Sequence, residues 1–259
     1  MKKLHKVILI LLFLLCFSLF IWQKERTKVE SPIPTISDAI SDSPSPTKVK
    51  TIEDDGHEVA YNLFIASPEQ VELFSNLKYS TDSATAKTVH NCRSLINAGF
   101  YTKENTHLGL FISNNEIIHP AIESTLVDGF LSIHENNIPT ISFDEPTDAP
   151  PIAVQSGPII WKNNARRPLR LIEDKFARRS IAGVTLDGRV VFITVYFNDQ
   201  EYSGPLLSRT PYILEKIQLA EKLRISDAIN LDGGSASAFI SEGTTLNEIS
   251  PIGGFFCIM

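Results

Sequence analysis

The sequence predicts an α+β domain in which a mixed, largely antiparallel sheet is made of hairpins and packed by a few helices. Short apolar runs flank the pairs Asn114-Asn115 and Asp187-Gly188, which is typical of hairpin turns. Helical spacing of apolar residues is clear in only one stretch, after Thr210. Strands and helices do not alternate regularly, so we do not expect a parallel sheet with crossover helices.

Each expected element before residue 200 has a local signal. Val190–Val195 is apolar enough to be buried on both faces of a sheet, whereas the arm before it alternates apolar and polar residues. In chain order we expect a strand at Val59–Ile65, a short helix at Ser83–Asn91, a strand at Ser94–Asn97, a hairpin of Leu108–Ser113 with Glu116–His119, and a hairpin of Ile181–Leu186 with Arg189–Phe197.

The clearest helix begins at Thr210-Pro211, with Thr210 expected as N-cap and Pro211 at the first helical position. Its apolar residues should form one stripe that packs on the sheet. That stripe consists of Ile213, Leu214, Ile217, Ala220 and Leu223. A strand at Ala228–Leu231 then leads to Asp232, and Ala238–Ile240 is expected to return as the partner of that strand.

The N-terminal residues 1–22 are expected to form a membrane anchor or uncleaved signal segment. Three lysines precede the unbroken apolar run Val7–Trp22, which is longer than a usual signal-peptide core and slightly short of a full span. No small-residue cleavage site follows, and Trp22 suits a membrane interface. We therefore expect a globular domain tethered outside the cytoplasm, in the periplasm or extracellular space. Secretion after signal cleavage stays open as the alternative.

Residues 23–57 are expected to be a disordered linker, because Ser-Pro pairs occur among Thr, Asp and Lys with few large apolar residues. The domain is then expected over residues 58–259, a length sufficient for one buried core.

The composition limits the partners. Charged residues make up 21% of the chain and its formal net charge is −6, which argues against a nucleic-acid-binding surface. No cysteine and histidine group has zinc-ligand spacing. Cys92 and Cys257 either pair in one disulfide or remain two buried thiols, and the sequence leaves both possibilities open. It does not define an oligomeric state.

Four segments combine apolar strands with small and polar residues at their ends, and we refer to them as the four polar segments. They are Asn97–Tyr101, Gln155–Pro158, Arg178–Ser180 and Asp232–Ser235. Together they supply amides, a guanidinium, hydroxyls and a carboxylate, which would suit a sugar phosphate or phosphodiester. Taken singly, each segment could also be a turn, a strand-edge cap or a surface cation. For Asp232-Gly233 alone, a hairpin turn is the stronger interpretation.

The same segments, in this order, resemble the phosphodiester glycosidase domain family of bacterial exopolysaccharide-related proteins and of the mannose 6-phosphate uncovering enzyme. The family's closing motif is Asn-Leu-Asp-Gly-Gly-Gly-Ser-Ser, and Asn230–Gly234 matches its first five residues. Ser235 replaces the third glycine, Ala236 replaces the first serine, and Ser237 keeps the second. The three upstream segments are similar to the family's Asn-Gly-Gly-Phe-Phe, Gln-Ser-Gly-Pro and Arg-Thr or Arg-Asn motifs. Asp199, where the family often has Asp-Gly-Arg, is a second-rank carboxylate candidate.

The resemblance implies a hydrolase that cleaves a sugar from a sugar-1-phosphodiester in cell-envelope or exopolysaccharide glycans. Asp232 is expected as general acid, general base or metal ligand, and Arg179 as the phosphate-binding cation. The expected substrate-binding residues are Asn97, Gly99, Gln155, Ser156, Gly157, Ser180, Gly233, Gly234 and Ser235. A divalent metal such as calcium is an open question. Because the closing motif is altered, a non-catalytic glycan-binding or scaffolding domain is the alternative, and an anchored structural subunit is a third.

Overall fold

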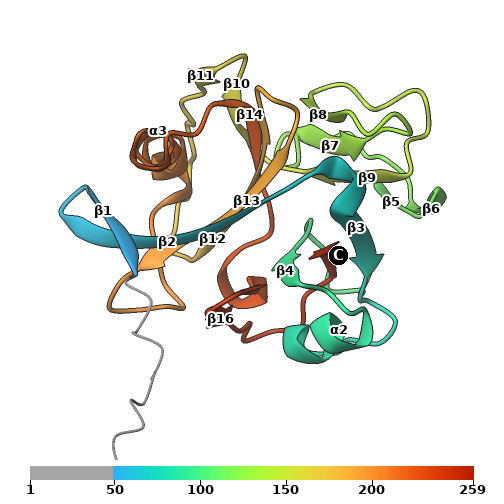
Figure 1. The fold of residues 1–259 in the computed structure, drawn as a ribbon, viewed down its shortest axis with the longest axis horizontal. Helices are drawn as coiled ribbons and strands as arrows, with labels where there is room; N and C mark the ends of the chain where they lie inside the picture. The colour runs from blue at the N-terminus through green and yellow to red at the C-terminus, as the bar shows by residue number, and fades with distance from the viewer. Residues whose placement is uncertain (1–48) are drawn as a thin grey trace, which may run out of the picture. The chain divides into compact units, whose positions relative to one another are not determined.

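A computed structural model describes residues 49–259, in which the strands form three antiparallel sheets (Figure 1). The seven-stranded sheet runs in the order β1 (Lys50–Asp54), β2 (His57–Ala66), β13 (Val190–Phe197), β12 (Arg179–Thr185), β14 (Ile225–Asn230), β10 (Ile159–Lys162) and β11 (Ala165–Arg166). The second sheet runs β16 (Thr244–Leu246), β15 (Phe239–Ser241), β4 (Ser94–Asn97), β17 (Gly254–Ile258) and β3 (Val71–Ser75). The third runs β6 (Glu116–His119), β5 (Phe111–Ser113), β9 (Ile152–Ser156), β7 (Gly129–Ile133) and β8 (Pro139–Ser142).

Helices are few among the described residues. They are α2 (Ser83–Val89), α3 (Thr210–Glu221) and the short 3-10 turns η1 (Pro68–Gln70), η2 (Leu207–Arg209) and η3 (Gly234–Ala236). The expected α+β class, with antiparallel strands and few packing helices, is confirmed. None of the helices in residues 49–259 is both long and apolar enough to cross a membrane. The expected anchor at residues 1–22 lies outside the described part of the chain.

Two apolar cores lie on opposite faces of the seven-stranded sheet. On one face, Ile213, Leu214 and Ile217 of α3 pack against β12 and β13. On the other face, Phe192 of β13 packs against Phe256 of β17, and the same core includes strands of the third sheet. The seven-stranded sheet therefore lies between α3 and the two smaller sheets.

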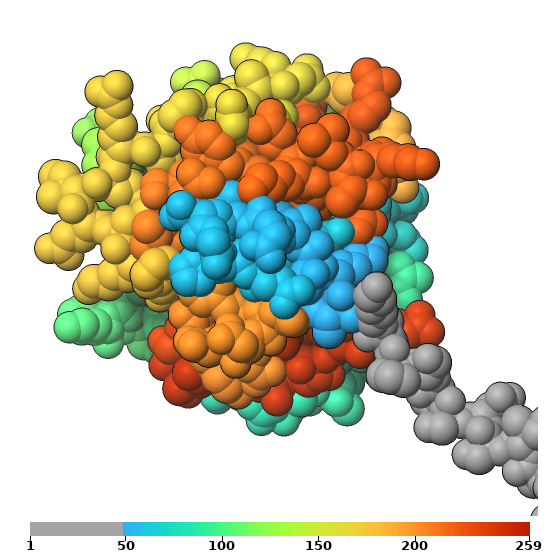
Figure 2. All heavy atoms as spheres, turned by 90° about the vertical axis from the view of Figure 1, so that its left-hand side faces the viewer, coloured from blue at the N-terminus to red at the C-terminus, as the bar shows by residue number. Residues whose placement is uncertain are grey.

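The β1–β2 hairpin corrects the expected start of the domain. Residues 50–57 were expected to be linker, but β1 pairs with β2 through a turn at Asp55-Gly56, where both residues have positive φ. Figure 2 shows this hairpin, in blue, lying beside the orange segment that contains α3. Lys50 and Tyr61 both bond to Glu221 of α3, at 2.9 and 2.7 Å. The Asp-Gly signal was present in the sequence, within a stretch dominated by linker composition. Residues 23–48 of the expected linker lie outside the described range.

Three further expectations about the last third of the chain were wrong. Thr210 is the first residue of α3 rather than its N-cap, and its hydroxyl donates to the Leu207 carbonyl at 2.6 Å. Ala220 is exposed and lies outside the apolar stripe. The segment after Asp232 does not return along β14, because β15 pairs with β4 and β16 in the second sheet. Residues 232–238 therefore connect two sheets, which excludes the hairpin interpretation of Asp232-Gly233.

Candidate active site

The four polar segments come together where β4, β9 and β14 end and β12 begins. Because β12 and β14 are antiparallel, with Ile181 opposite Asn230, the first residues of β12 lie beside the residues that follow β14. The Leu231 N–H donates to the Ser180 carbonyl at 2.8 Å, and the Asp232 N–H donates to the Ala98 carbonyl at 3.0 Å. Arg178–Ser180 thus opens a strand, whereas the sequence suggested a strand end.

Asn97, the last residue of β4, joins three of these segments. Its side chain is 1% exposed. Its Oδ1 accepts from the Ser180 hydroxyl at 2.7 Å and from the Ala238 N–H at 3.1 Å. Its Nδ2 donates to the Asp232 carbonyl at 2.7 Å. Asn97 therefore fixes the backbone of the Asp232 loop, and its oxygen is already occupied by two donors. This arrangement does not support the expected direct contact between Asn97 and a sugar.

Gln155 of β9 is likewise saturated by the protein. Its Oε1 accepts from the N–H groups of Leu110 and Ile122, both at 3.0 Å. Its Nε2 donates to the carbonyls of Ile122 and Val127, at 2.8 and 3.0 Å. An amide side chain offers two donors and an acceptor oxygen with two lone pairs, so no capacity is left for a ligand. Gln155 shapes the loop around Ile122, and its expected role as a sugar ligand is corrected to a positioning role.

The neighbours of Gln155 hold β9 against β14. The Ser156 hydroxyl donates to the Asn230 carbonyl at 2.8 Å, and Asn230 Nδ2 donates to the Gly157 carbonyl at 2.9 Å. Gly99, two residues after β4, packs closely against β9, since a Cβ there would lie 2.7 Å from Val154 Cγ2. These expected substrate-binding residues bring the segments together through internal contacts.

Arg178 is a buried residue whose role sequence reasoning missed. It is fully buried and donates to the Ser237 hydroxyl at 3.1 Å, to the Ser237 and Asn247 carbonyls, and to the Glu201 carbonyl at 3.2 Å. Burial lowers its pKa, and the charge of Glu201 acts in the opposite direction. Its contacts hold the chain beyond the Asp232 loop in place. The alternation of a strand puts residues 178 and 180 on one side and 179 on the other, but only the sheet contacts show which side is buried.

Arg179 lies on the other side, beside the glycines of the loop. A Cβ on Gly233 would lie 3.8 Å from both Cα and Cδ of Arg179. Its Nε donates to the Pro205 carbonyl at 3.1 Å, its Nη2 donates to the Lys175 carbonyl, and Asp174 Oδ1 lies 3.7 Å from Nη2. Within residues 49–259, Nη1 makes no hydrogen bond. The guanidinium is therefore held on one side and keeps donors for an anion on the other.

Asp232 is the carboxylate of this site. Its side chain is partly exposed, and its Oδ1 accepts from the Gly233 N–H at 2.8 Å. Burial raises the pKa of Asp232 to about 7, and the Gly233 hydrogen bond opposes this only in part. Burial also raises the pKa of Tyr101, and the negative charge of Asp232 adds to the effect, so this phenol lies near the acid. A carboxyl group that titrates near neutral pH is suited to proton transfer.

The glycines after Asp232 are required by the close packing of the loop. A Cβ on Gly233 would lie 2.8 Å from the Arg178 carbonyl oxygen. Gly234 has a φ of +61°, and its N–H donates to the same carbonyl at 2.8 Å. Ser235 is exposed, and its carbonyl accepts from the Ile249 N–H at 2.7 Å. Its hydroxyl is thus the expected sugar ligand that faces solvent in this loop.

Two further expectations concern Asp199 and a divalent metal. Asp199 is exposed in the turn after β13. In the part of the chain that the structure describes, no group of three or more His, Cys, Asp or Glu side chains is arranged to hold a metal ion.

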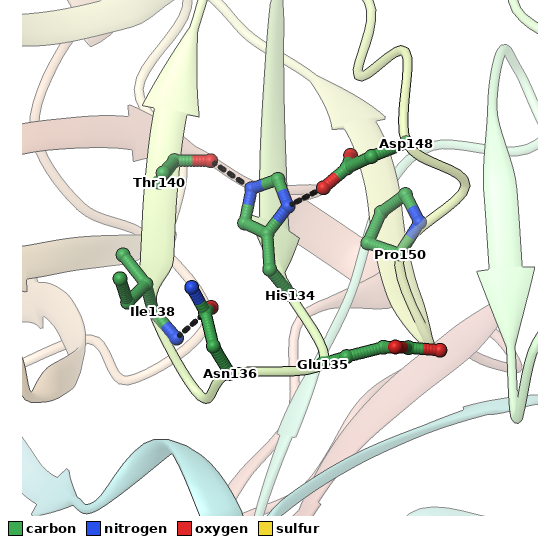
Figure 3. Close-up of a pocket in the computed structure, with 7 residues that line it drawn as sticks. All are labelled: His134, Glu135, Asn136, Ile138, Thr140, Asp148 and Pro150. Atoms are coloured by element: carbon green, nitrogen blue, oxygen red, sulfur yellow. Dashed lines mark hydrogen bonds and ion pairs between the residues drawn. The ribbon is translucent and has the colours of Figure 1, made fainter.

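Two pockets differ in their relation to the site. A pocket of about 240 Å³ is lined by Phe100, Gly157 and Pro158, which belong to the polar segments, and by Leu207 and other apolar residues. A larger one, about 490 Å³, lies at the β7–β8 hairpin and shares no residue with those segments (Figure 3). There His134 bridges Asp148 and Thr140, at 2.6 and 3.0 Å. The larger pocket is therefore separate from the candidate site, whereas the smaller one is lined by residues of the polar segments and connects to Arg179 through Leu207 and Asp174.

The fold and the site define an α+β protein with an acid and a guanidinium on adjoining segments. A family model described as phosphodiester glycosidase matches residues 90–254, so the chain belongs to the phosphodiester glycosidase family. The resemblance seen in the four polar segments is thereby confirmed. None of the curated protein sequences compared with the chain matches it.

Several solved structures share the fold. A hypothetical protein from Synechocystis has a TM-score of 0.62 at 12% identity, over 81% of this chain and 61% of its own. The zebrafish N-acetylglucosamine-1-phosphodiester alpha-N-acetylglucosaminidase catalytic domain, auto-inhibited by its pro-peptide, has a TM-score of 0.61 at 14% identity, over 83% of this chain and 84% of its own. A putative exported protein from Burkholderia pseudomallei has a TM-score of 0.52 at 11% identity, over 79% and 74%. This chain therefore spans less than two thirds of the Synechocystis protein. At these identities the similarity shows the fold alone.

Proposed function

We propose that this protein is a hydrolase that cleaves a sugar from a sugar-1-phosphodiester. The single observation that carries the proposal is that Asp232 and Arg179 both lie beside Gly233. The Gly233 N–H donates to the Asp232 carboxylate, and Arg179 packs against the same glycine. Membership of the phosphodiester glycosidase family supports this reaction class. The name of the zebrafish enzyme states an N-acetylglucosamine-1-phosphodiester as substrate, which is consistent with the proposal without fixing the sugar here.

In the proposed reaction Asp232 acts as general base. A water molecule gives a proton to the Asp232 carboxylate while its oxygen bonds to C1 of the sugar. The bond between C1 and the phosphate oxygen breaks, and the phosphate monoester leaves with the electron pair. Arg179 neutralises the negative charge that builds up on the phosphate. A pKa of about 7 leaves Asp232 basic enough to accept the proton and largely ionised just above neutral pH.

The four polar segments contain one carboxylate, Asp232, where glycoside hydrolases commonly use two, and Asp174 beside Arg179 is engaged by the Leu207 and Ser208 N–H groups. The second carboxyl normally protonates an alcohol leaving group. A phosphate monoester is a much better leaving group than an alcohol, so charge neutralisation by a guanidinium can replace that proton. The same observation favours the second candidate function, a glycan-binding domain without catalysis, for which Arg179 would bind the phosphate and Asp232 would be unnecessary.

The cellular setting is part of the proposal. We place the domain outside the cytoplasm, held by an anchor at residues 1–22 and acting on cell-envelope or exopolysaccharide glycans. Support comes from the disulfide between Cys92 and Cys257, since such bonds persist mainly in oxidising compartments. Secretion after signal cleavage remains the alternative.

The test compares the full chain with Asp232→Asn and Arg179→Lys on aryl and nucleotide sugar-1-phosphodiesters. We expect Asp232→Asn to lower kcat by about 10²- to 10⁴-fold, the usual range for a general base. Arg179→Lys should mainly raise KM, because a lysine loses bidentate contact with phosphate. Asp227→Asn, which removes a carboxylate from β14 that is paired with Lys162 at 2.9 Å, is the matched control. Unchanged turnover in Asp232→Asn would exclude Asp232 from the mechanism, and phosphate-ester affinity without turnover in the parent protein would establish the binding domain.

A further inference from the structure

We propose that the alcohol on the far side of the phosphodiester is apolar, an isoprenoid or long-chain alkyl alcohol, and that its first carbons lie in the pocket of about 240 Å³ that connects to Arg179 through Leu207 and Asp174. This inference rests on the proposed function and specifies the substrate class of the same site.

The walls of this pocket are hydrocarbon. Nine residues line it, and none of them is charged. Thr125 contributes the one side-chain hydroxyl. The main apolar contributors are Phe100, Leu108, Leu126, Pro158, Leu171 and Leu207. A sugar placed here would bury several hydroxyl groups without hydrogen-bond partners, which is unfavourable for each group. An alkyl or isoprenoid chain carries no such groups, so the pocket selects against a second sugar and in favour of hydrocarbon.

The pocket is joined to the candidate active site on two sides. On one side, Asn230 bonds to the Gly157 and Pro158 carbonyls, at 2.9 and 3.0 Å, two residues before Asp232. On the other side, the Leu207 N–H donates to Asp174 Oδ1 at 2.8 Å, and this oxygen lies 3.7 Å from Arg179 Nη2. A phosphate bound by Arg179 would therefore lie at the boundary between the acid and the hydrocarbon pocket, where its two ester groups separate.

The size of the pocket suits one end of a long chain. Complete small-molecule sites usually measure roughly 300–1,000 Å³, so a pocket of about 240 Å³ holds only part of a ligand. Apolar surface continues at its rim, where the Leu126 side chain is 72% exposed and Ile172, next to Leu171, is fully exposed. Exposed apolar residues that border a pocket are typical of ligand-contact surfaces. The rest of the chain would lie across this rim.

The experiment uses the full protein and a series of N-acetylglucosamine 1-phosphate and glucose 1-phosphate esters of methanol, butanol, octanol and farnesol, with a 6-O-mannosyl ester as the polar comparison. Each buried methylene contributes about fourfold to affinity. We expect kcat/KM for the octyl ester to exceed that of the methyl ester by about 10²-fold, as for three or four buried methylenes. Leu126→Asn should reduce the octyl-to-methyl ratio by about tenfold. Leu219→Asn alters an apolar residue of similar exposure on α3, at 76%, and should leave the ratio unchanged.

Each outcome decides the inference. Equal kcat/KM for methyl and octyl esters, or preference for the mannosyl ester, would overturn it while leaving the proposed function intact. Hydrolysis of none of the esters would overturn the proposed function instead. In that case titration calorimetry with octyl phosphate and methyl phosphate decides the pocket's role. Tighter binding of octyl phosphate that Leu126→Asn abolishes would support a hydrocarbon site, and equal affinities would exclude it.

Discussion

Replacing Asp232 by asparagine should stabilise the protein at alkaline pH and leave it unaffected at acidic pH. In the unfolded chain this carboxyl ionises near 3.8, whereas burial raises its pKa to about 7 in the folded protein. Between these values the folded state holds one more proton than the unfolded state. The free energy of unfolding therefore falls as pH rises through this window. Below pH 3.8 both states are protonated and Asp232 contributes nothing, and above pH 7 the full penalty remains.

The size of the effect follows from the same two values. Each pH unit between 3.8 and about 7 is worth about 1.4 kcal/mol, so the penalty reaches at most ~4 kcal/mol. Partial exposure of Asp232 makes this an upper limit. Asparagine keeps the oxygen that accepts from the Gly233 N–H and adds no charge, so it resembles the protonated acid. We expect Asp232→Asn to match the parent protein at pH 4 and to exceed its stability by about 2–4 kcal/mol at pH 8.

The assay is urea unfolding followed by far-ultraviolet circular dichroism at pH 4, 5, 6, 7 and 8, with the disulfide kept oxidised. Asp227→Asn is the control, because it removes a carboxylate that is paired with Lys162 and should not gain stability with pH. A difference between Asp232→Asn and the parent that stays constant from pH 4 to 8 would refute the reasoning. It would mean that Asp232 is not held in its neutral form by burial.

Three further substitutions test the internal contacts, each by the midpoint of urea unfolding. Arg178→Met should cost at least ~3 kcal/mol, because it leaves several buried carbonyls without a donor. Gly99→Ala should cost about 1–3 kcal/mol, since its Cβ would lie 2.7 Å from Val154 Cγ2; a neutral result would mean that β9 can shift away. Replacing both Cys92 and Cys257 by serine should cost about 4–5 kcal/mol, because the disulfide closes a loop with a sequence separation of 165 residues; a loss under 1 kcal/mol would contradict this.

The sequence predicted the elements whose signals are local. The hairpin of β12 and β13 follows from alternation around Asp187-Gly188, and β4 ends at Asn97 as expected. Pairing between distant strands was not predictable in this way. The strand after Asp232 is apolar enough to pair with β14 or with β4, and only the packing of the second sheet decides for β4.

The candidate site shows the same division between local and long-range information. The sequence pointed to Asp232 and Arg179 through the resemblance of their segments to the family motifs. The strand pattern alone does not distinguish Arg178 from Arg179, since neighbouring residues of a strand face opposite sides and the sequence does not show which side is buried. The disulfide was left open for a related reason: the 5.2 Å between the two Cα atoms depends on β17, at the end of the chain, lying beside β4.

The internal hydrogen bonds of the Asn97 and Gln155 side-chain amides explain what the polar motifs contribute to the site. Asn97 and Gln155 have the residue types of sugar ligands, yet protein groups already take up the donors and lone pairs of both amides. Their effect on a substrate must then be indirect, through the backbone of the Asp232 loop and the Gly157 wall of the pocket. A loop fixed in this way holds a carboxylate in a partly desolvated position without reorganising when a ligand binds, which is what electrostatic catalysis requires. Asn97 and Gln155 therefore act as supports for the residues of the site that keep capacity to contact a ligand, Asp232, Arg179 and Ser235.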